Sequence, residues 1–392
     1  MDFRGSPDSM NVTLIGPVYP YRGGIAHYNA SLAQALADAG HSVRLISFRR
    51  QYPTRLYPGE SDKDPSSEPI RFPAEYQLDP LYPWTWLHAA RTIRRQPTDL
   101  VVFHWWTTFW APAYTSLAWL IRRKVKVAYL IHNVFPHEAK AWDRWMARTT
   151  LNQGQAFIVQ APHERERLSK LIPTSSQVFV SPLPAFHPFS KQPLSKVQAR
   201  QLLGLPEDQP MLLFFGIVRP YKGLKYLIEA LASVQKPVHL IVAGEFWEDV
   251  TVYQQQIESR ALSQKLTLLN RYIPNEEAHR LFSAADGLVA PYVGGTQSGA
   301  AGLALGYGLP MIITDRVAAG LPEGFRSERT SEAAARNPGY AHIVPAADPQ
   351  ALAQAIDSLL TCLPLLTTAP FAAAEDWARL VHVIEEIGRE KL

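Results

Sequence analysis

Two cations and two glycines follow a short apolar run near the middle of the chain. The segment reads Gly216-Ile-Val-Arg219-Pro-Tyr-Lys222-Gly223, between an expected strand, Met211–Gly216, and an expected helix, Lys222–Val234. An arginine fork can hold a phosphate while a lysine three residues further on adds a point charge. Two solvated surface charges are the alternative. Because this loop lies at the carboxyl end of a strand, we favour a clamp for a diphosphate.

The first expected strand, Asn11–Gly16, leads into a second glycine-bearing loop. Gly23 and Gly24 precede a helical pattern that includes His27. Two adjacent glycines let backbone N–H groups approach an anion closely, so these residues are candidates for an acceptor or phosphate loop. A tight strand-to-helix turn explains them equally well. The loop does not fit G-x-G-x-x-G, which weakens a nicotinamide-binding interpretation.

Uncharged donors gather in a third loop, and a histidine ends another strand. Thr296, Gln297, Ser298 and Gly299 precede a helix and suit phosphate or sugar hydroxyls, with a flexible turn as the alternative. His132 closes the expected strand Val125–Ile131, where a histidine is better placed for function than a lone histidine usually is. No histidine or acidic cluster has the spacing of a metal site. Asp286 is expected to end a helix or order a turn.

Strands alternate with helical patterns along most of the 392 residues, which predicts two doubly wound, mostly parallel α/β domains. A proline-rich linker at Ser181–Pro193 divides the two patterns, and a cleft between the domains would be the default ligand site. Thr54–Tyr82 is rich in Pro, Ser, Asp and Glu, so we expect a long exposed loop. The single cysteine, Cys362, excludes a disulfide framework and permits a reducing compartment.

Charge and tryptophan are distributed unevenly. Residues 1–190 hold 21 Lys/Arg and 14 Asp/Glu, whereas residues 191–392 hold 18 and 21, and the total of +4 is too small to suggest a nucleic-acid binder. Eight of the ten tryptophans lie between Trp84 and Trp145, beside the basic run Arg122–Lys126. This pattern suits a membrane surface or a lipid-diphosphate acceptor, or else an aromatic core with solvated charges.

The uncharged stretch Leu100–Ile121 is long enough for a membrane span. We favour a strand, a loop and a surface helix, because Pro112 interrupts the stretch and its middle is polar and aromatic. The N-terminal residues show no export signal. We therefore expect a cytoplasmic protein, and peripheral contact with the inner face of the membrane stays one of the two alternatives for the tryptophan-rich stretch.

Together these motifs resemble the retaining glycosyltransferases of family 4, which have the GT-B fold of two Rossmann-like domains facing across a cleft. The matching features occur in the family's order along nearly the whole chain. They are the double-glycine loop followed by Gly40-His41, the histidine His132, the pair Arg219 and Lys222, the strand ending in Ala243-Gly244-Glu245, the stretch Tyr272–Glu277, and Leu281–Tyr292.

The resemblance implies a role for each matching residue. His132, Arg219 and Lys222 would be catalytic, the last two stabilising the departing diphosphate. Gly216 would belong to the donor site, and the nucleotide pocket would include Glu245, Arg271, Tyr272 and Ile273. Most members carry two glutamates before a Gly-x-Pro, but the corresponding positions here hold Gly295 and Leu303. The chain therefore resembles a branch in which Thr296, Gln297, Ser298 and Gly299 make the donor contacts.

The resemblance implies transfer of a sugar, of the hexosyl type, from a nucleotide-diphosphate donor to a glycan or lipid-linked hydroxyl with retention of anomeric configuration, without metal or other cofactor. We expect an acceptor-side domain at 1–187, a donor domain at 188–370 and a helix at 371–392 that returns to the first domain. Two alternatives stay open. Gly295 and Leu303 favour a non-catalytic nucleotide-sugar-binding protein, and two Rossmann-like halves would also suit a nicotinamide-dependent oxidoreductase.

Overall fold

The computed structural model describes residues 9–135, 140–186, 189–190, 192, 194–295, 297–321, 341–365 and 373–390. Contacts divide the chain into two compact units. Unit 1 comprises Met1–Pro65, Pro69–Pro182 and Ala374–Leu392, and unit 2 comprises Ser66–Glu68 and Leu183–Ala373.

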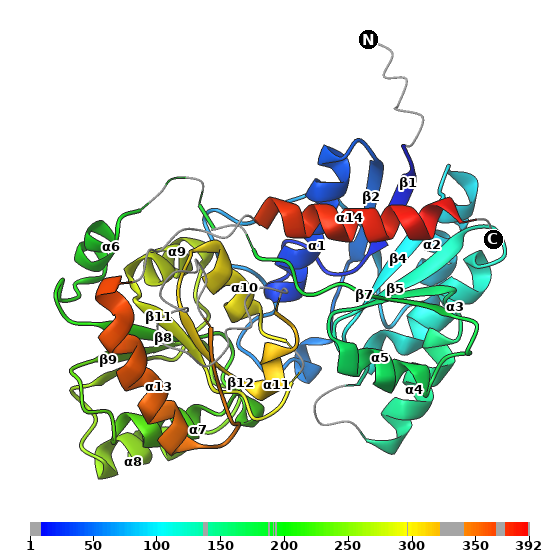
Figure 1. The fold of residues 1–392 in the computed structure, drawn as a ribbon. Coiled ribbons are helices and arrows are strands. Elements are labelled where there is room, and N and C mark those ends of the chain that lie inside the picture. The colour runs from blue at the N-terminus through cyan, green and yellow to red at the C-terminus, as the bar shows by residue number, and fades with distance from the viewer. Residues whose placement is uncertain are drawn as a thin grey trace. The chain divides into compact units, whose positions relative to one another are not determined.

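Unit 1 is built on a seven-stranded parallel sheet with the order β3-β2-β1-β4-β5-β6-β7 (Figure 1). Its strands are β1 (Asn11–Ile15), β2 (Ser42–Phe48), β3 (Glu75–Leu78), β4 (Leu100–Trp105), β5 (Lys126–Ile131), β6 (Ala156–Val159) and β7 (Gln177–Val180). Its helices are α1 (Gly24–Asp38), η1 (Thr54–Leu56), α2 (Pro83–Arg95), η2 (Thr108–Trp110), α3 (Ala111–Ile121), α4 (Ala141–Leu151), α5 (Pro162–Ser169) and α14 (Ala373–Arg389).

Alternate residues of the central strands face two different layers. Val101, Phe103 and Trp105 of β4 belong to a core that also holds residues of α2, α3 and α4. His104, between them, turns to the opposite face, where its ring contacts that of Tyr28 in α1. The helix α14 joins this second layer of unit 1 (Figure 1). Its Trp377 packs on Tyr28, and its Glu385 bonds His41.

Unit 2 is built on a six-stranded parallel sheet with the order β10-β9-β8-β11-β12-β13. Its strands are β8 (Met211–Phe215), β9 (His239–Ala243), β10 (Leu266–Leu269), β11 (Gly287–Ala290), β12 (Met311–Thr314) and β13 (Ala341–Val344). Its helices are α6 (Lys196–Leu203), η3 (Pro220–Lys222), α7 (Leu224–Leu231), α8 (Val250–Ser259), α9 (Asn275–Ala284), α10 (Gly299–Gly306), α11 (Asp315–Ala318), α13 (Pro349–Cys362) and η4 (Leu363–Leu365).

Two sheets of parallel strands joined by helices confirm the predicted α/β class with two Rossmann-like domains. The predicted interruption of Leu100–Ile121 is also present, as β4, η2 and α3. No helix in the described part of the chain is long and apolar enough to cross a membrane.

The expected long exposed loop at Thr54–Tyr82 is wrong in two respects. It contains the edge strand β3, which pairs with β2 although its sequence, Glu-Tyr-Gln-Leu, lacks an apolar run. Asp64 is also buried there, with its backbone N–H bonded to the carbonyl of Pro20 and Lys63 over the ring of Tyr21. Backbone pairing with a neighbouring strand orders a segment whose composition predicts no strand.

Asp286, which follows α9, ties α6 to the start of β8. Its carboxylate accepts from Lys196 Nζ at 2.6 Å, from the buried Arg200 at 2.5 Å and from the backbone N–H of Met211 at 2.7 Å. Instead of ending a helix or ordering a turn, Asp286 therefore joins α6 to β8, since α9 already ends at Ala284. Its partners in α6 and β8 would be left without their acceptor if the carboxylate were removed.

Asp286→Ala should destabilise unit 2 by about 3–5 kcal/mol, because it leaves the buried Arg200 guanidinium uncompensated. Urea unfolding followed by the fluorescence of Trp247 in unit 2, read against a variant lacking that indole, measures the change. The matched control is the exposed Asp208→Ala, which should shift unfolding by less than about 0.5 kcal/mol. Equal stability of the two variants would contradict the role given to Asp286.

Candidate active site

The strand order of unit 2 reverses between β8 and β11, and the two predicted cations lie in the loop after β8. At such a reversal the connecting segments leave in opposite directions, so the loops at the strand ends diverge and leave space for a ligand. Arg219 precedes the single turn η3, and Lys222 ends it. Val293 N–H donates to the carbonyl of Tyr221 at 2.8 Å, which joins the loop after β11 to this turn.

Each cation lies over an aromatic ring from a neighbouring loop. The guanidinium carbon of Arg219 is 5.4 Å from the ring centre of Trp247, and Lys222 Nζ is 5.3 Å from that of Tyr292. Trp247 Nε1 donates to Glu245 at 2.8 Å, and Tyr292 is held by the hydroxyl of Ser298 at 3.2 Å. The rings orient the two cations without neutralising them.

Burial lowers the pKa of Lys222, and the nearby Arg219 guanidinium lowers it further. Two like charges close together, one of them withdrawn from water, favour an anion between or beside them. The prediction that Arg219 and Lys222 lie in one loop at a strand end is confirmed, and their shared catalytic role stays a prediction.

Glycines keep the walls of this loop close together. Gly223 has φ +71°, and a Cβ there would overlap the carbonyl oxygen of Pro291. A Cβ at Gly216 would lie 3.0 Å from Lys222 Nζ. The expected helix Lys222–Val234 therefore starts later, as α7 at Leu224, because the left-handed backbone at Gly223 ends the preceding turn.

The other predicted donor-site residues follow neighbouring strands of the same sheet. Glu245 follows β9, and Val218 N–H donates to its carbonyl at 2.9 Å. Arg271, Tyr272 and Ile273 follow β10, where Arg271 is exposed and bonded to Glu277 at 2.6 Å while Ile273 is buried. These residues share the edge of the sheet that carries Arg219, and their role in binding a nucleotide stays a prediction.

The third predicted loop supplies the start of α10. Ser298 is the N-cap of this helix, its hydroxyl accepting from Ala301 N–H at 3.2 Å, and Gly299 is the first helical residue. Gln297 precedes them half-buried, whereas Thr296 lies outside the described residues. Gly295 precedes this helix and Leu303 is buried within it, so this stretch presents no carboxylate.

In unit 1 the histidine His132 is buried and is paired with a residue that the sequence did not single out. Its Nε2 lies 3.0 Å from Nδ1 of His104, and the two rings stack with centres 5.3 Å apart. Tyr28 sits edge-on to both rings, at 5.2 Å from His132. His104 escaped notice because it lies inside the apolar run of β4, 28 residues from its partner.

Burial lowers the pKa of His132 to about 3 and the pKa of His104 well below its usual range. Both rings are therefore neutral at pH 7, and the bond between them fixes one proton at the shared position. His104 Nε2 is buried without a hydrogen-bond partner. An unpartnered lone pair costs less than an unpartnered N–H, so we expect His104 Nδ1–H to donate and His132 to carry its own proton on Nδ1.

The predicted double-glycine loop begins α1. Gly23 is its N-cap, Gly24 is its first residue, and a Cβ at either would meet nothing within 4 Å. His27 does not line this open loop. Its side chain is buried, with Nε2 3.5 Å from the carboxylate of Asp64. This contact links the first turn of α1 to Asp64. A role of Gly23, Gly24 and His27 in binding an acceptor or phosphate stays a prediction.

Comparisons with known proteins agree with this architecture. Solved structures similar to it over 97% of this chain include sucrose-phosphate synthase from Thermosynechococcus elongatus (18% identity, TM-score 0.65, 96% of that chain), Anabaena HepE in complex with UDP-glucose (16%, 0.70, 98%) and WaaG, a glycosyltransferase involved in lipopolysaccharide biosynthesis (18%, 0.57, 100%). At these identities the likeness establishes the fold class, which is GT-B. A search of curated protein sequences gives no match.

The family follows from sequence models of each half. Residues 22–183 match the model of glycosyltransferase family 4, and residues 209–362 match that of the group 1 glycosyl transferases. The chain belongs to the family 4 glycosyltransferases. This confirms the resemblance drawn from its motifs and leaves the nicotinamide alternative without support.

Between pH 8 and pH 5 neither ring of the buried histidine pair should take up a proton, because burial lowers the pKa of both. Histidine-selective NMR measures both the protonation state and the tautomer. Because unfolded histidine has a pKa of about 6.5, the pair should lower the stability of unit 1 as the pH falls below that value.

In His104→Phe the fixed tautomer of His132 should be lost, so that the NMR signals of His132 move toward a mixture of Nδ1–H and Nε2–H forms. His88→Gln is the control and should leave the pair unchanged. A pair that titrates near pH 6.5, or a His132 tautomer indifferent to His104, would refute this description.

Affinity for a nucleoside diphosphate should fall as the pH rises through the lowered pKa of Lys222, because only the protonated amine attracts the phosphates. Lys222→Arg should bind with little change over the same range, since an arginine stays protonated. Calorimetric titration with UDP and ADP from pH 7 to pH 10 measures this, with Lys225→Arg as the control that keeps the original profile. Parallel pH profiles for Lys222→Arg and the unaltered chain would count against the clamp.

Proposed function

We propose that this glycosyltransferase moves a sugar, of the hexosyl type, from a nucleotide-diphosphate donor to an acceptor hydroxyl with retention of anomeric configuration. The observation that supports the donor class most strongly is the pair Arg219 and Lys222, held over Trp247 and Tyr292 at the point where the strand order reverses. The solved complexes of similar fold with UDP-glucose and with ADP support the same donor class.

The chemical demand on the site is the charge that develops on the leaving diphosphate. A bond forms between the acceptor oxygen and the anomeric carbon, and the bond from that carbon to the diphosphate breaks with its electron pair going to the diphosphate. The departing diphosphate then takes up the proton of the acceptor hydroxyl. The Arg219 fork and the Lys222 ammonium would stabilise that charge as it grows. We propose that these two cations meet the demand without a metal ion.

The remaining donor contacts are assigned by position on the sheet edge. We propose that Glu245 and the stretch Arg271–Ile273 bind the nucleoside, and that Gly216 lets the phosphates approach the backbone. Gln297, Ser298 and the N–H of Gly299 would contact phosphate or sugar hydroxyls at the start of α10, together with Thr296. We propose that the neutral His132 positions the donor sugar near the reacting carbon.

Unit 1, with its open Gly23–Gly24 loop, would take the acceptor, which we propose to be a glycan or a lipid-linked sugar in glycan or glycolipid assembly. The similar fold of WaaG, involved in lipopolysaccharide biosynthesis, is consistent with this class. We propose peripheral contact of unit 1 with the inner face of the cytoplasmic membrane.

A non-catalytic protein that binds nucleotide sugars is the second candidate, and one observation favours it. Gly295 and Leu303 stand where most family members have glutamates, and Leu303 is buried in α10. Turnover separates this candidate from the enzyme, because both would bind the donor.

The donor is best found by measuring thermal stabilisation with UDP-, GDP- and ADP-sugars. A donor present at a hundred times its Kd should stabilise the fold by about 2.7 kcal/mol. Arg219→Ala and Lys222→Ala should each abolish that stabilisation, whereas the exposed Lys225→Ala should retain it. Stabilisation by every donor class in all three variants, or by none in the unaltered chain, would contradict the proposed site.

With the donor identified, transfer to acceptors is followed by NMR of the anomeric proton of the product. The product should keep the donor's anomeric configuration and should form in the presence of EDTA. An inverted product would contradict retention. Donor binding with no transfer to glycan or lipid-linked acceptors and no donor hydrolysis would favour the non-catalytic protein.

A further inference from the structure

The outward side of α2 combines apolar and cationic residues. Trp84 is 63% exposed and Leu87 is 44% exposed in its first half, and Arg91, Arg94 and Arg95 are exposed in its second half. The opposite side of the helix packs into the core of unit 1 through Thr85, Ala89 and Ile93. Core packing therefore accounts for the apolar residues on the buried side of α2, but it does not account for the exposed Trp84 and Leu87.

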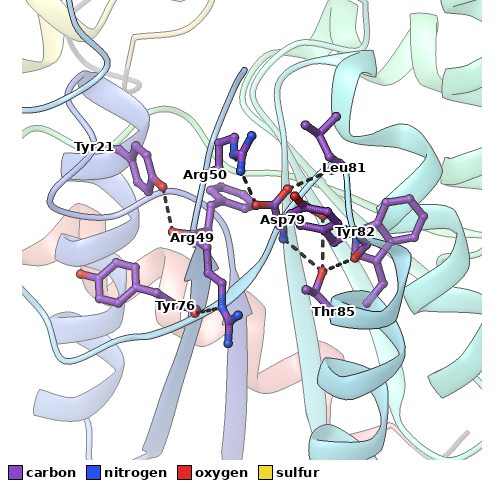
Figure 2. Close-up of polar contacts among 10 residues, drawn as sticks. Tyr21, Arg49, Arg50, Tyr76, Asp79, Leu81, Tyr82 and Thr85 are labelled. Carbon is purple, nitrogen blue, oxygen red and sulfur yellow. Dashed lines mark hydrogen bonds and ion pairs between the residues drawn. The ribbon is translucent and has the colours of Figure 1, made fainter. Parts of the chain in front are cut away.

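The turn that leads into α2 is held firmly by a buried carboxylate (Figure 2). Asp79 accepts from the N–H of Leu81 at 3.0 Å and pairs with Arg50 at 3.4 Å. Trp86 Nε1 donates to the carbonyl of Asp79 at 2.8 Å, and Thr85 Oγ1 donates to that of Tyr82 at 2.6 Å. Leu81 and Tyr82, 52% and 41% exposed, are thus presented on a rigid turn.

The next two helices continue the same surface. The helices α2, α3 and α4 pack side by side over one face of the sheet and share one core. On α3 and its following turn the exposed residues include Trp119, Arg123 and Lys124. Trp119 is 60% exposed, although tryptophan in a folded domain is mostly buried.

The helix α4 repeats the combination within two turns. Trp142 and Trp145 are 54% and 69% exposed, and Arg144 and Arg148 are exposed beside them. The tryptophans of this stretch are therefore divided between the core and the surface. Trp105 and Trp110 belong to the buried core, whereas four other tryptophans lie on the outside of three adjacent helices.

Carboxylates are missing from this outward side. In α2, α3 and α4, every residue of which the structure describes, Asp143 is the sole acidic residue. It is buried, accepting from Thr108 and from the N–H of Lys140. The exposed residues of α2, of α3 with its following turn, and of α4, which we call the tryptophan–arginine face, thus carry positive charge with no exposed carboxylate among them.

We propose that the tryptophan–arginine face binds the surface of an anionic phospholipid bilayer. Indole and leucine side chains fit the boundary between headgroups and acyl chains, and arginines beside them fit lipid phosphates. Exposed Leu87, together with exposed Leu81 in the turn just before α2, favours lipid over nucleic acid, because aliphatic side chains do not stack on bases as aromatic rings do. The face gives the proposed contact of unit 1 with a membrane a definite location and a lipid chemistry.

The use of this surface to reach a lipid-linked acceptor rests on the proposed transferase function, but vesicle binding itself does not. The experiment therefore uses the full chain without donor. Sedimentation with vesicles of phosphatidylcholine, alone or mixed with phosphatidylglycerol, measures lipid binding. Thermal stabilisation by the nucleotide sugar, measured separately, reports on the donor site, so that failure of one proposal is distinguishable from failure of the other.

Two pairs of substitutions test the two parts of the face. Arg94→Gln with Arg95→Gln should weaken binding to the mixed vesicles on the order of 30-fold at low salt and reduce its salt dependence. Trp142→Gln with Trp145→Gln should weaken binding while leaving the salt dependence in place. The control, Leu202→Gln with Arg260→Gln, changes an exposed apolar and an exposed cationic residue of unit 2 and should bind as the unaltered chain does.

Binding that requires phosphatidylglycerol and is lost in both test pairs but not in the control would support the proposal. No binding to mixed vesicles, equal binding to neutral ones, or equal loss in the control would overturn it. Binding to single-stranded DNA or heparin without binding to vesicles would overturn it as well, by showing a general polyanion surface. Circular dichroism of each variant checks that the fold is retained.

Discussion

A parallel sheet whose strand order reverses has one place where neighbouring loops must diverge, and both units of this chain put their distinctive polar residues there. In unit 2 the reversal lies between β8 and β11, and the loops that follow these strands contain Arg219 and Tyr292. In unit 1 it lies between β1 and β4, and His104 is the last residue but one of β4. Because right-handed crossovers place the helices on opposite faces on either side of a reversal, this constraint creates the space before any particular side chain fills it.

Aromatic rings decide how the polar groups are presented at these strand ends. In unit 2 the rings of Trp247 and Tyr292 lie against cations, which keeps the charges in place while leaving them able to attract an anion. In unit 1 Tyr28 lies edge-on to two imidazoles that burial keeps neutral. The same type of contact thus supports a charged group in one unit and an uncharged hydrogen-bonding pair in the other.

The sequence predicts those parts of the fold and site that depend on local pattern. The expected strand Val125–Ile131 is observed as Lys126–Ile131, and Arg219 and Lys222 stand out because charges after an apolar run are unusual. Long-range pairing is beyond such reasoning. The strand β3 depends on hydrogen bonds to β2. His104 becomes a candidate only through its contact with His132, which directly follows the neighbouring strand β5. The rings beneath the two cations come from separate loops, so spacing along the chain gives no sign of them.

The helix α14 belongs to unit 1, although all of unit 2 separates it from the rest of that unit in the chain. It supplies Trp377 against Tyr28, which in turn covers the two histidines, and Glu385 against His41. On the ribosome, therefore, the sheet of unit 1 emerges early but its second layer is completed only when the last helix has been made. An apolar surface of unit 1 therefore stays uncovered while the whole of unit 2 is synthesised. The order in which the units are completed thus differs from the order of synthesis.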